Sequence, residues 1–156
     1  MRIGVISDTH RIISSIERLE DEIKGLDVLI HLGDNVDDIL IIKKYFKGNI
    51  INVKGNCDFS TNTPNDRVEE ICGKKFFITH GHRYGVKENL LQLRYKALET
   101  GSDIVLYGHT HIAQINFDGG IWYINPGSAS LPRDGDRSFA IISINEENIE
   151  PNLIRF

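Results

Sequence analysis

The amino-acid sequence predicts one domain, residues 1–156, of the α/β (or α+β) class, in which two packed sheets are flanked by helices. Three observations lead to this prediction. Apolar runs alternate with helical patterns as far as residue 53, which is the order of parallel strands joined by helices. The last third of the chain is almost entirely strand-like. A chain of 156 residues is also about one domain long and can bury a substantial core.

The first third of the chain has the pattern of a β-α-β-α-β unit. Its strands are expected at residues 2–7, 27–32 and 49–53. Its helices are expected at residues 14–25 and 37–48. Ser14 and Glu17 have the spacing of a capping box for the first helix, and Asp37 is the expected N-cap of the second. We therefore expect the first sheet to be mixed and mainly parallel.

The remainder of the chain begins with a polar loop at residues 56–66. A hairpin turning at Gly73-Lys74 is then expected from residues 67–72 and 75–79. The next segment, 86–101, is expected to be a helix, and its apolar residues are spread so widely that a broad face should be covered. The strands that follow are expected in a mostly antiparallel second sheet, at residues 104–107, 113–117, 121–125, 138–144 and 149–156.

Composition argues against several functional classes. The net charge of −4 and the scattered positions of the 18 lysines and arginines disfavour a groove for long nucleic acid, because such grooves carry a basic excess. Cys57 and Cys72 are expected to be free thiols of a reducing compartment. Nothing resembles a signal peptide, and no apolar run approaches the ~20 residues of a membrane span. We therefore expect a cytoplasmic protein without a membrane partner.

Side chains that can bind a metal ion follow five of the predicted strands, and glycine lies beside them in four cases. The five groups are Asp8-Thr9-His10, Gly33-Asp34-Asn35, Lys54-Gly55-Asn56, His80-Gly81-His82 and Gly108-His109-Thr110-His111. Ligands bind at the carboxyl ends of parallel strands in open α/β sheets, so these loops are expected to converge on one rim. Glycine permits the sharp turns and close approach that convergence requires.

Two interpretations compete for each group taken alone: a surface pair or helix cap, and a pair of metal ligands. Residues i and i+2 of an extended strand point to the same side, so D-x-H and H-x-H can each present two ligands together. His31 lies within a strand and is interpreted as a packed or hydrogen-bonded structural residue. Five groups in register with five strand ends favour ligands, which are Asp8, His10, Asp34, Asn56, His80, His109 and His111.

The composition of this ligand set indicates which ions it suits. It has no cysteine, which disfavours a closed structural zinc site. Seven ligands are too many for one ion with an open position, but they suit two ions that share a carboxylate. Mixed nitrogen and oxygen ligands fit Mn²⁺, Fe, Zn²⁺, Co²⁺ or Ni²⁺. Two divalent ions per chain are therefore expected.

The ordered motifs GVISDTH, HLGD, KGNCD, ITHGH, YGHTH and INPGS resemble those of the calcineurin-like metallophosphoesterases. Within that superfamily they are similar to the small single-domain YfcE-type phosphodiesterases, over Met1 to about Leu131. The resemblance implies a four-layered α/β/β/α sandwich and a phosphodiesterase acting on small phosphate esters. It further implies attack by metal-bound hydroxide, with Mn²⁺ as the favoured ion.

The resemblance also implies a role for each ligand. One ion would be held by Asp8, His10, Asp34 and His111, and the other by Asp34, Asn56, His80 and His109, with Asp34 bridging. Many relatives carry a histidine after the asparagine of the G-N motif, where this chain has Cys57. The general acid is therefore left among three candidates, in the order Cys57, then His82, then Asp58.

Two questions remain open at this level. The motif INPGS is either a strand end with a Pro-Gly turn or a loop from which Ser128 or nearby Arg133 meets the phosphate. The function has two alternatives to a small-ester phosphodiesterase: a metal-braced protein-binding scaffold like the retromer subunit of this fold, and a nuclease acting on short oligonucleotides. The sequence predicts neither the oligomeric state nor the physiological substrate.

Overall fold

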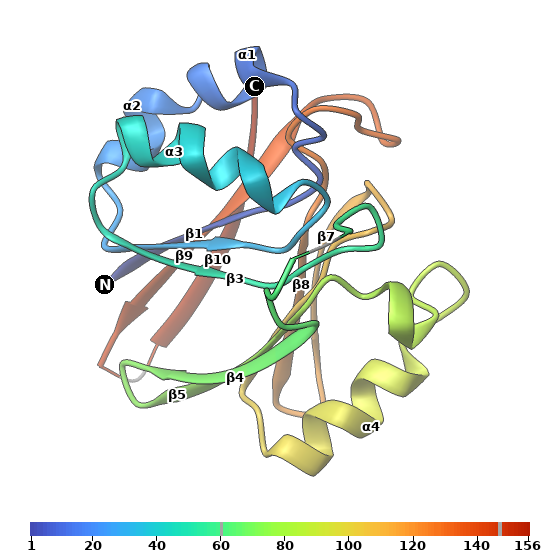
Figure 1. The fold of residues 1–156 in the computed structure, drawn as a ribbon. Coiled ribbons are helices and arrows are strands. Elements are labelled where there is room, and N and C mark those ends of the chain that lie inside the picture. The colour runs from blue at the N-terminus through green and yellow to red at the C-terminus, as the bar shows by residue number, and fades with distance from the viewer. Residues whose placement is uncertain (60, 147) are drawn as a thin grey trace.

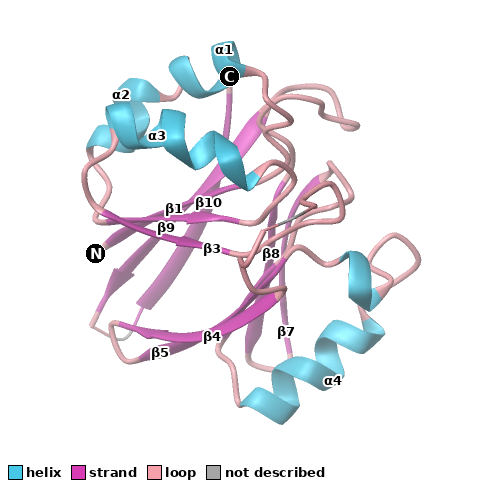
Figure 2. Cartoon of the chain, viewed as in Figure 1, coloured by secondary structure: helices cyan, strands magenta, loops and turns pink. Residues whose placement is uncertain are grey.

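The fold is a sandwich of four layers, which confirms the predicted class. The computed structural model describes residues 1–59, 61–146 and 148–156. Two five-stranded sheets pack face to face. Helices α1, α2 and α3 cover the outer face of one sheet, and α4 covers the outer face of the other, as Figures 1 and 2 show. Residue 60, in the predicted polar loop, and residue 147, between the last two strands, lie outside the described residues.

The first sheet has the strand order β10-β9-β1-β2-β3. Its strands are β1 (Arg2–Ile6), β2 (Val28–His31), β3 (Asn49–Asn52), β9 (Ser138–Asn145) and β10 (Asn148–Arg155). The helices on it are α1 (Ile13–Glu17), α2 (Glu20–Lys24) and α3 (Ile39–Tyr45), with the short 3-10 helix η1 (Val36–Asp38) before α3. β1, β2 and β3 are parallel as expected, whereas β9 and β10 add an antiparallel hairpin beside β1, so the sheet is mixed but not mainly parallel as expected.

The second sheet has the strand order β4-β5-β6-β8-β7. Its strands are β4 (Asp66–Ile71), β5 (Lys74–Thr79), β6 (Ile104–Leu106), β7 (Ala113–Asp118) and β8 (Ile121–Pro126), with η2 (His82–Tyr84) and α4 (Leu91–Thr100). β6 runs parallel to both of its neighbours, β5 and β8. The expectation of a mostly antiparallel sheet is therefore wrong. The last hairpin joins the first sheet because β9 needs apolar cover on both faces.

Three apolar layers separate the four structural layers, and strand alternation assigns residues to them. Ile3 and Val5 of β1 pack between the sheets, against Phe76 and Ile78 of β5. Phe77 of β5 points the other way and packs beneath α4. The helices α1 to α3 cover a third cluster that includes Ile16, Leu19, Ile23, Ile42, Phe139 and Ile141. β1 and β5 are thus buried on both faces, which explains their unbroken apolar runs.

The helices depart from their predicted boundaries. The first predicted helix is interrupted between α1 and α2, and its capping box is wrong because α1 already begins at Ile13. Asp37 does not cap α3, whose N-cap position is occupied by Asp38. The hairpin turns at Cys72–Gly73 instead of Gly73–Lys74. None of the described helices combines the length and the apolar character needed to cross a bilayer.

The third predicted helix begins late and is covered narrowly. Residues 86–90 are not α-helical: the N–H groups of Glu88 and Asn89 close a turn on the carbonyl of Gly85, and the side-chain oxygen of Asn89 accepts the N–H of Leu91 (2.9 Å). Only Leu93 and Ala97 of α4 are buried. Leu91 and Leu98 are 52% and 68% exposed, so the expectation of a wide covered face is wrong.

Candidate metal centre

The loops that follow β1, β2, β3, β5 and β6 meet at one end of the sandwich. Backbone hydrogen bonds tie them in pairs: the N–H of Asp8 donates to the carbonyl of Gly33 (3.1 Å), and that of Gly108 donates to the carbonyl of His80 (3.0 Å). The N–H of Cys57 donates to the Asp34 carboxylate (2.9 Å), which attaches the loop after β3. The predicted rim therefore exists, and it is built from both sheets.

Two motif glycines are required by how closely these loops approach. A Cβ atom on Gly55 would collide with the Asp34 carboxylate and its backbone nitrogen. A Cβ atom on Gly108 would collide with the Ser7 hydroxyl and would lie 3.0 Å from Asp8 Oδ2. A side chain at either position would push two predicted ligand loops apart.

The backbone around the rim is in an unusual conformation. Nine described non-glycine residues have positive φ, and five of them are predicted ligands: Asp8, His10, Asp34, His109 and His111. Left-handed backbone costs an L-residue roughly 1–2 kcal/mol, and such strain collects at functional sites. It also changes how D-x-H and H-x-H present their side chains, because these residues are not in the extended conformation from which the prediction was made.

Asp8, His10, Asp34 and His111 form one compact group. One potential ligand atom from each lies within 4.8 Å of all the others. The Nε2 atom of His111 is 3.1 Å from Asp8 Oδ1, and that of His10 is 3.8 Å from both Asp8 Oδ1 and Asp34 Oδ2. The two histidines meet at 3.4 Å although 101 positions separate them in the chain. The structure thus brings together all four residues of the first predicted ligand set.

Three members of the second predicted set, Asp34, His80 and His109, lie together beside the first set, and Asp34 is shared with it. The Nε2 atom of His80 is 3.5 Å from Asp34 Oδ1, and the His80 and His109 rings are 5.1 Å apart. Asn56 is exposed, and its amide nitrogen lies 3.4 Å from the Cys57 sulfur. Asp34 therefore offers one oxygen to each set, which is the geometry that a bridging carboxylate needs.

Two of the histidines are oriented from behind by backbone carbonyl groups. His80 Nδ1 lies 2.8 Å from the Leu32 carbonyl, and His111 Nδ1 lies 2.6 Å from that of Leu131. A carbonyl can only accept, so in the neutral ring Nδ1 carries the hydrogen and Nε2 keeps its lone pair toward the carboxylates. His80 Nε2 is buried and has no hydrogen-bond partner among the described residues, and buried Asp8 Oδ1 faces only the Nε2 atoms of His111 and His10, at 3.1 and 3.8 Å. These atoms fit a divalent ion.

Burial and neighbouring charges shift the titration of the rim. Burial alone would raise the pKa of the Asp8 carboxyl, but the hydrogen bond with His111 and the charges of His80 and His111 lower that pKa to about 2. The hydrogen bond to Asp8 raises the pKa of His111. Burial, together with the charges of His80 and Lys87, lowers the pKa of His109 to about 4. Asp8 is thus a carboxylate, and His109 a neutral imidazole, at neutral pH.

The three candidate general acids lie beside the centre in different environments. His82 is half-buried, 5.3 Å from the His80 ring and 6.1 Å from the His109 ring, with a buried Nδ1 that has no described partner. Burial lowers the pKa of His82. Burial and a hydrogen bond with Asp34 raise the pKa of the Cys57 thiol to about 11. Both Asp58 oxygens are occupied by backbone N–H groups.

Asp58 connects the loop after β2 to the loop after β3. Its carboxylate accepts four backbone N–H groups at 2.8–2.9 Å, from Asp34, Asn35, Val36 and Gly55. Hydrogen bonds to an ionised acceptor are roughly twice as strong as neutral ones. Asp58 therefore holds in place the two loops that carry Asp34 and Asn56.

We expect Asp58→Ala to lower the free energy of unfolding by about 2–4 kcal/mol, because four N–H groups lose a charged acceptor. Urea denaturation measures this loss. Asp37→Ala, which removes a neighbouring exposed carboxylate, is the matched control and should stay within ~0.5 kcal/mol of the parent. Equal stability of the two variants would show that the loops do not depend on Asp58.

The sequence analysis missed the polar network behind the ligands. The Ser128 and Ser130 hydroxyls donate to the Asp8 carbonyl (2.8 and 2.7 Å), so Ser128 supports the first ligand loop and faces away from the rim opening. Arg133 is exposed and lines a cavity of about 330 Å³ with Lys87, Thr110 and neighbouring residues. Ser128 lies in the motif INPGS, whereas no motif pointed to Ser130.

A second hidden network involves His31, whose expected structural role is borne out by its contacts. His31 Nδ1 accepts the Gly33 N–H (3.1 Å), so Nε2 carries the hydrogen and donates to the Thr9 hydroxyl (3.1 Å). The Thr9 hydroxyl donates to Asp38 (2.6 Å), which also accepts the Arg11 N–H (2.9 Å). Burial lowers the pKa of His31, which keeps the ring neutral.

Comparison with known proteins agrees with this geometry. Residues 1–147 match the model of the calcineurin-like phosphoesterase superfamily domain. The probable metallophosphoesterase YsnB of Bacillus subtilis is 33% identical over 151 residues, which are 94% of this chain and 86% of that protein. The phosphodiesterase YfcE of Escherichia coli is 31% identical over 118 residues, which are 64% of this chain and 60% of that protein.

Solved structures show the same fold. A predicted phosphoesterase from Streptococcus pneumoniae has a TM-score of 0.83 at 31% identity, covering 99% of this chain and 88% of that chain. Vps29 from Entamoeba histolytica has a TM-score of 0.81 at 22% identity, covering 100% of this chain and 99% of that chain. The second likeness is one of fold alone.

Proposed function

This chain belongs to the calcineurin-like phosphoesterase superfamily, and from that premise we propose that it is a phosphodiesterase that hydrolyses small phosphate esters with two divalent metal ions. The proposed first ion is held by Asp8, His10, Asp34 and His111. The proposed second ion is held by Asp34, Asn56, His80 and His109. Mn²⁺ is the proposed ion on the family resemblance, and the mixed carboxylate and imidazole ligands suit Fe, Zn²⁺, Ni²⁺ and Co²⁺ as well.

The observation that carries this proposal is the position of Asp34 between two sets of imidazole nitrogens. Its two oxygens lie 3.8 Å from His10 Nε2 and 3.5 Å from His80 Nε2. Buried carboxylates and imidazoles held at such distances without aligned hydrogen bonds destabilise a fold unless they bind something. Two ions bound there would neutralise phosphoryl oxygens and lower the pKa of a water molecule that becomes the nucleophile.

The protein's own groups would then position the ligands and transfer the proton. Ser7 donates to Asp8 Oδ2 (2.6 Å), which leaves Oδ1 facing the histidines. The Leu32 and Leu131 carbonyls hold the His80 and His111 rings in the ligating tautomer. We assign the leaving-group proton to the imidazolium form of His82, because its ring lies beside those of His80 and His109. Burial lowers the pKa of His82, so this proton is available mainly below the ordinary imidazole pKa. The Cys57 thiol, with a pKa raised to about 11, is a weaker acid, and the Asp58 carboxylate is occupied by four N–H groups.

The direct test combines ion counting with an ester assay. We expect protein purified without chelator to contain close to two transition-metal ions per chain by elemental analysis. Bis(p-nitrophenyl) phosphate should be hydrolysed with added Mn²⁺. Protein dialysed against a chelator and assayed without added metal should be at least about a hundredfold slower. One ion per chain at saturation, with full activity, would contradict the dinuclear proposal.

Two outcomes would favour other functions. Two bound ions with no hydrolysis of any mono- or diester would favour the metal-braced scaffold. Rates higher on short single-stranded oligonucleotides than on small esters, falling steeply as salt is added, would favour the nuclease, because phosphate-backbone contacts weaken with salt.

A further inference from the structure

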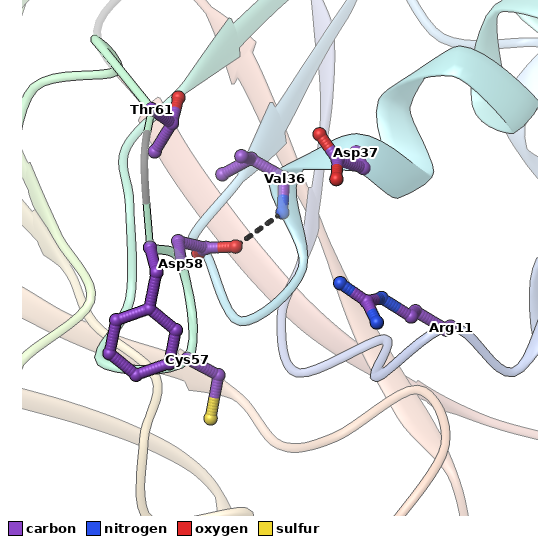
Figure 3. A pocket seen from close by; sticks show the side chains of 7 residues that line it. Arg11, Val36, Asp37, Cys57, Asp58 and Thr61 are labelled. Atoms are coloured by element: carbon purple, nitrogen blue, oxygen red, sulfur yellow. Dashed lines mark hydrogen bonds between the residues drawn. The ribbon is translucent and has the colours of Figure 1, made fainter.

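A cavity of about 340 Å³ lies beside the proposed metal centre, on the side of the loops after β1 and β3. It is lined by Arg11, Val36, Asp37, Cys57, Asp58, Phe59 and Thr61 (Figure 3). Arg11 directly follows the predicted ligand His10, and Cys57 directly follows Asn56. A chemical group bound in this cavity and a phosphate bound at the centre could therefore be parts of one substrate molecule. Its volume is at the lower end of the range for small-molecule sites.

Arg11 has a backbone conformation that is unfavourable for a residue with a side chain. Its φ is +60°, in the left-handed region where glycine carries no Cβ penalty. The backbone is held there because the Arg11 N–H donates to Asp38 Oδ2 (2.9 Å), a bond that glycine would make equally well. The guanidinium group forms no ion pair among the described residues, and in Figure 3 it points into the space between Asp37 and Cys57. The side chain therefore adds strain that no recorded hydrogen bond or ion pair among the described residues offsets.

Phe59 is the second side chain of interest in this cavity. It is 83% exposed, the most exposed large apolar side chain among the described residues. It lies on the loop that Asp58 anchors, and it lines the same cavity as Arg11. An exposed aromatic ring at the rim of a polar cavity offers a stacking surface, and a guanidinium plane stacks and donates hydrogen bonds as well.

The remaining lining indicates what kind of group fits. Asp37 supplies an acceptor, Thr61 supplies a hydroxyl, and Val36 supplies an apolar wall. The Asp58 carboxylate is already occupied by backbone N–H groups, one of them the N–H of Val36, drawn in Figure 3. The Asp37 carboxylate, beside the single guanidinium cation of Arg11, disfavours binding of a second phosphate group in this cavity. A flat ring with both donor and acceptor edges matches the set.

We propose that this cavity binds a nucleobase or similar planar heteroaromatic group carried on one arm of the phosphodiester, stacked on Phe59 and hydrogen-bonded by Arg11. The proposal rests on the proposed function, and it narrows the substrate class to nucleotidyl esters. Arg11 and Phe59 are then specificity-determining residues. The reaction at phosphorus does not need them.

The kinetic test uses two diesters that share the same leaving group. They are the p-nitrophenyl ester of thymidine 5′-monophosphate and ethyl p-nitrophenyl phosphate. Both release p-nitrophenolate, so the ratio of their kcat/KM values isolates the retained arm. We expect Phe59→Ala to lower this ratio about tenfold, the usual size of a lost base–aromatic stack. Phe117→Ala, which removes another exposed phenylalanine on β7, should keep the parental ratio.

Arg11→Gly separates a binding role from a structural one. We expect the same ratio to fall at least about threefold through the lost hydrogen bonds, while the Tm holds or rises because the left-handed strain is relieved. A drop in Tm with an unchanged ratio would show that Arg11 serves the fold, and it would overturn its assignment.

A binding measurement keeps the inference testable without turnover. Adenosine 5′-monophosphate and ribose 5-phosphate differ by the base, and their Kd values can be compared by titration calorimetry of the unmodified and Phe59→Ala proteins. We expect the base to tighten binding about tenfold in the parent and to add little in the variant. Equal Kd values in the parent would overturn the inference. Base-dependent binding without hydrolysis of either ester would instead refute the proposed function and leave the cavity assignment intact.

Discussion

Asp34→Asn is expected to lower kcat/KM for bis(p-nitrophenyl) phosphate at least about a thousandfold in the presence of Mn²⁺. The substitution preserves the size of the side chain, but it replaces one carboxylate oxygen by an amide nitrogen and removes the negative charge. Asp34 is the only described carboxylate that lies within 4 Å of both His10 Nε2 and His80 Nε2. Losing its charge therefore weakens both proposed ion sites together.

The measurement pairs initial rates with elemental analysis of the same preparation. The variant should retain well under two ions per chain and an unchanged far-ultraviolet circular dichroism spectrum. Asp21→Asn is the matched control, because the Asp21 side chain is 97% exposed on α2 and its only described ion pair is with Lys24. Wild-type turnover by Asp34→Asn would remove the basis of the two-ion assignment.

His109→Ala is expected to reduce the ion count from two per chain to one and to lower kcat/KM at least about a hundredfold. His109 belongs only to the second proposed set, whereas the compact group of Asp8, His10, Asp34 and His111 keeps all its members. The backbone N–H of His109 still donates to Asp8 Oδ2 (3.2 Å) after the substitution, so the first set keeps its support.

Ion counting distinguishes a lost ligand from a distorted fold. All six histidines lie in the centre or directly behind it, so the control must be another residue type. Tyr95→Ala, at a position 65% exposed on α4, should bind two ions and turn over normally. A His109→Ala protein that still binds two ions would move His109 out of the ligand set, whatever its activity.

The sequence predicted the secondary structure well where one local signal dominates. The buried runs at β1 and β6 were placed to within one residue, because strands covered on both faces need continuous apolar residues. Helix starts were placed less evenly. The first was one residue late, the start of α3 was two residues early, and the start of α4 was five residues early, because residues 85–88 form a turn that the periodic pattern does not distinguish from a helix.

Sheet membership was beyond the reach of local patterns. The final hairpin, β9 and β10, has the same alternation whichever sheet it joins. It pairs with β1 because Phe139 and Ile141 complete the cluster beneath α1 to α3. That choice depends on contacts with residues more than a hundred positions away, which no window of sequence contains.

By itself, the sequence determined the fold class, the family resemblance and the residue types at the strand ends, since an apolar run followed by glycine and a metal-binding side chain is a local pattern. The tertiary structure alone decided that Asp34 faces two histidine sets, that Asp58 holds two loops together, and that Arg11 and Phe59 share one cavity. The physical reason is that distances between side chains on different loops are set by strand order and by left-handed backbone at the rim, and both arise from packing across the whole molecule.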